Sequence, residues 1–121
     1  MRREERDAAY LWDMLDAARA VEGFVAGVGA EEYGKNRQLQ YAVERALEII
    51  GEAARRVSEA CRATQPAIPW VQMIGQRNVL AHEYGEIRHE RIWLVATRRI
   101  PELIRLLEPL VPDEGRPPSA E

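Results

Sequence analysis

The chain has 121 residues, of which 46% are hydrophobic and 31% charged, as in a single folded domain, and this composition excludes a disordered or multidomain chain. The net charge of −3 gives no overall attraction to nucleic acid or to an anionic membrane, so any phosphate site must be local. One cysteine, Cys61, and two histidines offer neither an intrachain disulfide nor a zinc cluster, so we expect no metal and no cofactor. Because no apolar run reaches about 18 residues, we expect no membrane segment and a cytoplasmic location.

The first half of the chain predicts two long amphipathic helices. Apolar residues spaced three and four apart predict a helix over about 5–26, and the glycine-containing stretch 27–34 is typical of a connection with room for one short turn. A second helix is expected from Asn36, a suitable N-cap, to about Arg62. Its periodicity is the strongest in the sequence: Leu39, Val43, Ala46, Ile50, Ala53, Val57 and Ala60. Gly51 inside this pattern costs about 1 kcal/mol relative to alanine, which predicts that another helix crosses closely there.

The second half predicts a shorter helix and an interrupted one. Pro69, after a break at 64–69, suits the first position of a helix from Trp70 to about Tyr84, which Gly85 would end. A fourth amphipathic segment follows over about 87–110, and Pro101 should kink or divide it.

No strand pattern occurs in the sequence, so an all-α fold is expected. We predict an up-down bundle of four or five helices with short connections, formed by one domain over 1–111. The tail 112–121 has nothing to bury and is expected to be disordered.

The candidate chemistry gathers on the third helix, because Arg77, Asn78, His82 and Tyr84 occur within eight residues. Histidine is the side chain that titrates near neutral pH, and a guanidinium binds phosphate. Residues five positions apart are separated by about 140° around the helix axis, so Arg77 and His82 do not share a face. Two such helices facing each other across a twofold axis would close the groups into one cleft. The alternative is that Arg77 and His82 only make hydrogen bonds at a helix end.

Four blocks in the same order resemble the HEPN superfamily, and within it the HepT-like ribonuclease toxins of prokaryotic toxin–antitoxin pairs. The resemblance covers about residues 8–108. The blocks are IIGEAA at 49–54, IPW at 68–70, the R-N-x3-H-x-Y signature RNVLAHEY at 77–84, and Trp93 followed by IPEL at 100–103. Glu83 stands where the family often has glycine, which adds a negative charge beside the predicted RNA site.

The resemblance implies a homodimer, formed through the helices that carry Arg77 and His82, that cuts RNA without a metal. The 2′-hydroxyl would be the nucleophile and a 2′,3′-cyclic phosphate the product. His82 would act as general base or acid, and Arg77 would stabilise the phosphate. Asn78 would orient His82 or a phosphate oxygen. The family also implies a partner, a minimal nucleotidyltransferase antitoxin of the MntA type that transfers AMP to Tyr84, where the added charge and bulk would block the anion site.

Two other functions stay open at the level of sequence: a non-catalytic adaptor for a nucleotidyltransferase, and a plain helical dimerisation domain. Other residues have simpler interpretations. The three tryptophans are expected in the core or at a dimer contact, and His89, in a run of charged residues, is expected on the surface without a role. The pair Arg98 and Arg99 is expected on a solvated face, although it could extend an RNA-binding stripe.

Overall fold

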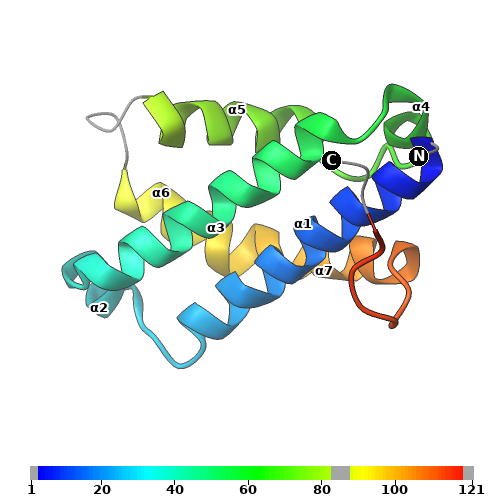
Figure 1. The fold of residues 1–121 in the computed structure, drawn as a ribbon. Helices are drawn as coiled ribbons and strands as arrows, with labels where there is room; N and C mark the ends of the chain where they lie inside the picture. The colour runs from blue at the N-terminus through cyan, green and yellow to red at the C-terminus, as the bar shows by residue number, and fades with distance from the viewer. Residues whose placement is uncertain (1–2, 83–87, 119–121) are drawn as a thin grey trace.

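A computed structural model describes residues 3–82 and 88–118, and all its regular elements are helical (Figure 1). The described part of the chain contains no strand, so the all-α prediction is confirmed. The α-helices are α1 (Arg3–Val25), α2 (Ala30–Lys35), α3 (Arg37–Arg56), α4 (Glu59–Ala63), α5 (Trp70–His82), α6 (His89–Leu94) and α7 (Ile100–Leu107). A π-helical turn at 95–99 joins α6 to α7, and a 3₁₀ turn at 108–110 follows α7.

The long helices alternate in direction, as predicted for an up-down bundle. In Figure 1, α3 runs diagonally between α1 and α5, and it packs extensively against both. α7 packs against α1, so α1 and α3 form the centre of the bundle. The core holds the apolar stripe predicted for the second helix, and its buried members are Val43, Ala46, Ile50, Ala53 and Val57. Burial of this stripe supplies the main force that fixes α3 in place.

The predicted helix over 36–62 begins as expected but ends early. The Asn36 side chain accepts a hydrogen bond from the Leu39 amide at 3.0 Å, which confirms the N-cap. The helix stops at Arg56, because Val57 is extended and Ser58 caps a separate helix, α4. The buried carboxylate of Asp7 fixes this break by accepting hydrogen bonds from the Ser58 amide at 2.8 Å and from its hydroxyl at 2.6 Å. A partner 51 residues away in the chain therefore overrides the local periodicity.

Gly51 lies where α3 and α5 cross, which confirms the prediction made from its position. A Cβ atom at Gly51 would stand 2.7 Å from the Met73 carbonyl oxygen and would overlap the Cβ atom of Arg77. Only a residue without a side chain permits this separation of the two backbones. The crossing therefore places Arg77 directly against α3.

Both prolines act close to where the sequence predicted. Pro69 stands one position before α5 and not at its first residue, because its carbonyl accepts the Met73 amide at 3.1 Å as an N-cap does. The fourth segment is divided as expected. Its helix widens into the π-helical turn, and α7 then carries Pro101 in its first turn, where the missing amide proton is not needed.

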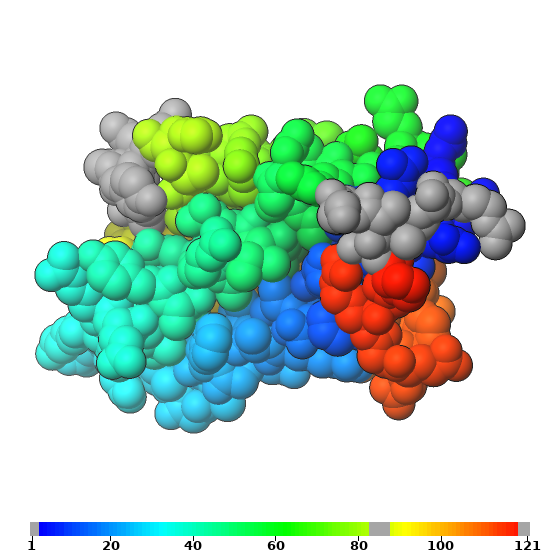
Figure 2. All heavy atoms as spheres, in the orientation of Figure 1, coloured from blue at the N-terminus to red at the C-terminus, as the bar shows by residue number. Residues whose placement is uncertain are grey.

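The C-terminal segment crosses back over α1 after α7, and its described part, up to residue 118, lies against that helix in Figure 2. The Arg116 guanidinium holds the segment by donating to both carboxylate oxygens of Asp13, at 2.8 and 3.0 Å. The disorder expected for the tail stays a prediction. The predicted continuation of α5 to Tyr84 and its stop at Gly85 lie outside the described residues. Among the described helices, none is long and apolar enough to cross a membrane.

Candidate functional site

Arg77 lies at the crossing of α5 with α3, and two polar partners hold its guanidinium. Its Nη2 atom is 3.3 Å from Oε2 of Glu52 on α3, and its Nη1 atom donates to Oδ1 of Asn78 at 3.0 Å. The side chain is 27% exposed, so the group is held by the fold and still reaches solvent. A guanidinium fixed in this way presents its remaining N–H donors in a defined direction.

The Glu52 carboxylate gathers three arginines. Its Oε1 atom accepts from Nη2 of Arg55 at 2.7 Å and from Nε of Arg56 at 3.1 Å, while Oε2 faces Arg77. Hydrogen bonds from Arg55, then those from Arg56 and the nearby charge of Arg77, lower the pKa of Glu52 to about 2, against the opposing effect of partial burial. The carboxylate is therefore ionised at physiological pH. We name the group Glu52, Arg55, Arg56 and Arg77 the Glu52 cluster.

His82 is exposed at the last position of α5, one turn after the exposed Asn78. Within the described residues, no hydrogen bond or ion pair joins His82 to Arg77, as expected from their angular separation on one helix. The fold thus brings Arg77 and Asn78 together and leaves His82 apart on the same element. Tyr84, the predicted AMP acceptor, and Glu83 lie outside the described residues.

His89, which was expected on the surface without a role, has a 42% exposed side chain that contacts two other helices. Its Nδ1 atom lies 3.6 Å from Oε2 of Glu44, and its ring meets that of Tyr33 edge to face at 6.4 Å. Tyr33 is fully buried, and its ring also packs on Trp93 at 5.2 Å. Burial raises the pKa of Glu44, while the nearby His89 opposes that rise. These contacts join α6 to α2 and α3, which gives His89 a structural role.

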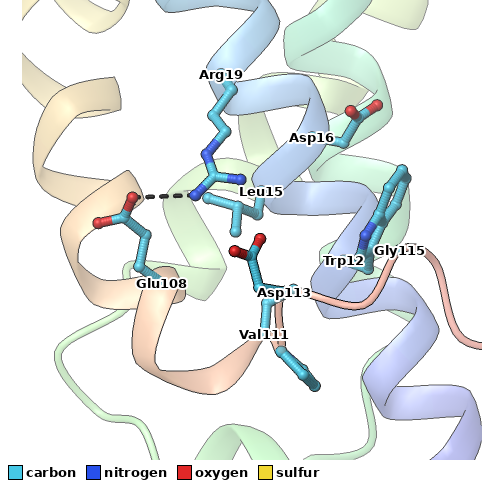
Figure 3. Close-up of a pocket in the computed structure, with 9 residues that line it drawn as sticks. Trp12, Leu15, Asp16, Arg19, Glu108, Val111, Asp113 and Gly115 are labelled. Carbon is cyan, nitrogen blue, oxygen red and sulfur yellow. Dashed lines mark hydrogen bonds and ion pairs between the residues drawn. The ribbon is translucent and has the colours of Figure 1, made fainter.

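Two surface hollows flank α1, each with a volume of about 310 Å³. One lies between α1 and the C-terminal segment, where Arg19 donates to Glu108 at 3.0 Å (Figure 3). The other, which we name the α1–α3 groove, opens beside the Glu52 cluster. Its lining residues are Tyr10, Asp13, Arg45, Ile49, Glu52, Ala53, Arg56 and Arg116. Among the described residues, no group of three or more histidine, cysteine, aspartate or glutamate side chains could hold a metal ion.

Comparison with known proteins shows the family of the chain. The family model described as "Ribonuclease HepT-like" matches residues 14–110, a span that includes α5 and the whole Glu52 cluster. The chain belongs to the HepT-like ribonuclease family. A candidate RNase of Methanocaldococcus jannaschii is 37% identical to this HepT-like chain over 100 residues, covering 83% of the chain and 92% of the relative. A candidate ribonuclease HepT of Thermococcus cleftensis is 34% identical, covering 85% and 92% respectively. No solved structure matches the chain.

The sequence did not assign the Glu52 cluster, although Glu52 and Arg77 lie in two of the blocks that carried the resemblance, at 49–54 and 77–84. Glu52 follows Gly51 directly. Because Gly51 allows α3 and α5 to cross closely, the side chain of Glu52 reaches Arg77 on α5. The adjacency of a helical glycine and a carboxylate was the available signal. It could not name Arg77 as the partner, because the pairing depends on how α5 crosses α3.

Proposed function

We propose that this HepT-like chain is a metal-independent endoribonuclease, the toxin of a toxin–antitoxin module. Family membership supports ribonuclease activity. The single observation that carries the assignment of the site is Arg77, which is held by Glu52 and Asn78 on a helix that also carries an exposed His82. One helix therefore carries both an anion-binding group and a proton carrier. Cleavage of a phosphodiester bond requires both.

In the proposed reaction, His82 accepts the proton of a ribose 2′-hydroxyl, and the 2′-oxygen attacks the adjacent phosphorus. The P–O5′ bond breaks, the 5′-oxygen takes a proton from water, and a 2′,3′-cyclic phosphate is left on the other fragment. His82 then releases the proton that it accepted to the solvent. Arg77 stabilises the charge that builds on the phosphoryl oxygens, since a fixed guanidinium needs no rearrangement during the step. Asn78 orients Arg77 through its side-chain oxygen. Two protomers facing through α5 would complete the site by placing the His82 of one near the Arg77 of the other.

We further propose that a minimal nucleotidyltransferase antitoxin neutralises the protein by transferring AMP to Tyr84. Tyr84 follows His82 by two residues in the chain, so an attached phosphate would lie near the cationic groups that bind RNA. Mass measurement of Tyr84-containing peptides, from protein produced with and without the partner gene, would detect the adduct. An adduct found at another residue, or none, would overturn this part.

A cleavage assay in EDTA tests the nuclease itself, on total tRNA and on an mRNA transcript, with Arg77→Ala and His82→Ala as variants. We expect the wild-type protein to cut and to leave cyclic phosphate ends, and each variant to lose at least about 100-fold in rate, as is usual for a general acid–base group or a phosphate-stabilising contact. Unmodified dimeric protein that leaves both RNAs intact would reject the nuclease and favour the non-catalytic adaptor.

A further inference from the structure

The Glu52 cluster holds more positive charge than its carboxylate can neutralise. Three guanidiniums surround one carboxylate, which leaves two net positive charges. Both carboxylate oxygens already accept two contacts each, and a carboxylate offers about four acceptor positions. Glu52 is therefore saturated, while each guanidinium carries five N–H donors. The four contacts to Glu52 use a minority of these donors, while Arg77 also donates to Asn78 and Arg56 also forms a hydrogen bond with Tyr10.

The two arginines that the proposed reaction does not use are also the more accessible ones. The side chains of Arg55 and Arg56 are 51% and 46% exposed, compared with 27% for Arg77. They follow Glu52 by three and four residues, so one turn of α3 carries all three. Because Arg55, Arg56 and Arg77 all contact the carboxylate of Glu52, the first two lie next to Arg77. A chain of phosphates bound at Arg77 would therefore meet a second cationic position directly beside it.

The α1–α3 groove extends this position along the surface. Arg56 and Glu52 line its wall beside α3, and Arg45 and Arg116 line it farther on, with Asp13 as the second carboxylate of the lining. Arg116 donates to Asp13, and Arg45 lies 3.6 Å from Glu48. Arginine thus outnumbers carboxylate along the groove, whereas the whole chain carries a net charge of −3. A local excess of arginine on an acidic protein favours a polyanion at this place.

We propose that Arg55 and Arg56 form a second phosphate subsite, which binds an RNA phosphate neighbouring the one at Arg77 and leads the strand into the α1–α3 groove. This inference rests on the proposed ribonuclease function. Glu52 sets the spacing between the two phosphate positions, because it binds the guanidiniums of both. The subsite contributes to binding of RNA longer than one phosphodiester and takes no part in the bond-breaking step.

The test compares Arg55→Gln/Arg56→Gln with a matched control, Arg98→Gln/Arg99→Gln, another exposed consecutive pair that removes the same charge from a different element. The ligands are a 2′-O-methyl RNA decamer, which cannot be cut at a modified ribose, and a 2′-O-methyl dinucleotide with a single phosphodiester. We expect the first variant to bind the decamer about tenfold more weakly and the dinucleotide as wild type does. The slope of log Kd against log salt should fall by about 0.7, the value for one lost phosphate contact to a single strand.

Four results would overturn the subsite. The first is unchanged decamer binding in Arg55→Gln/Arg56→Gln, and the second is no decamer binding by wild type. The third is an equal loss in the control pair, which would show that position on α3 does not matter, whether through overall charge or through a broad arginine stripe. The fourth is an equal loss on the dinucleotide, which would place the effect at Arg77. Failure of the proposed function looks different: wild type would bind the modified decamer through Arg55 and Arg56 and leave unmodified RNA uncut. Thermal unfolding of both variants confirms that each is folded.

Discussion

A single carboxylate, that of Glu52, controls the charge at the crossing of α3 and α5. In the folded protein its pKa is lowered from the ordinary value of 4.5 to about 2, chiefly by hydrogen bonds from Arg55. Folding therefore favours the ionised form, so Glu52 contributes stability above pH 4.5 that is lost as the pH falls toward 2. The same charge holds Arg77 in place, which links the stability of the crossing to the geometry of the site.

We predict that Glu52→Gln lowers the urea midpoint of unfolding at pH 7, and that the difference from wild type shrinks steadily below pH 4.5. The reason is that protonation of Glu52 at low pH leaves the wild type without a charge at this position, as the glutamine variant is at every pH. Urea titrations at several values between pH 2.5 and pH 7 measure the effect. Glu48→Gln is the matched control, because Glu48 lies one turn earlier and its ion pair with Arg45 is long, at 3.6 Å. A constant difference across the whole range would show that the Glu52 contacts do not depend on its charge.

At the scale of elements, the helices and their crossing were predictable where local signals agree with the fold. The Asn36 cap, the apolar stripe of α3, the division near Pro101 and the tight contact at Gly51 all follow from residues within one segment. The end of α3 could not be predicted, because the Asp7 carboxylate that binds Ser58 comes from another helix. The contacts of His89 could not be predicted for the same reason, since Glu44 reaches it from α3.

The crossing of α3 and α5 depends on the absence of a side chain at Gly51. We predict that Gly51→Ala destabilises the protein by about 1–3 kcal/mol, although alanine is the better helix former by about 1 kcal/mol. The added methyl group would press on the Met73 carbonyl oxygen, and a backbone atom moves only if α5 moves. Because α5 carries Arg77, RNA cleavage should fall with stability.

Gly23→Ala is the control for this prediction. Gly23 is also helical, but a methyl group there would meet open space within the described structure. We expect this variant to be as stable as wild type or up to about 1 kcal/mol more stable. Denaturant titration of the two variants gives the comparison. If Gly51→Ala were also stabilised, the close approach of the two helices would be refuted.

At the scale of the whole molecule, one long face of α5 has no partner within the described chain. Trp70 and Leu80 are the buried residues of this helix, and its outward side is exposed over its length: Val71, Gln72, Gly75, Asn78, Val79 and His82. Two of these are valines, and Val71 is 79% exposed. The groups at the candidate site, Arg77 and His82, are spread around the same helix. Dimerisation through α5 would cover the apolar residues and bring these groups of two protomers together.

The fold therefore predicts a homodimer, which a measurement of the protein's mass in solution can test. The wild-type protein should have about twice the chain mass of 13.8 kDa, and Val71→Glu should have the mass of one chain, because dimerisation would bury its charge. The monomeric variant should keep its helical circular dichroism and lose RNA cleavage, since each site would then lack the residues of the second protomer.

Phe24→Glu provides the control, because Phe24 is a 41% exposed apolar residue one position before the end of α1. This end of α1 lies away from α5 in Figure 1. This variant should stay dimeric and active, which separates loss of the α5 contact from the general effect of adding a charge. A dimeric Val71→Glu protein would place the interface on another face. A wild-type monomer that cleaves RNA would show that Arg77 and His82 of one chain suffice, so that the angle between them on α5 must be spanned by the RNA itself.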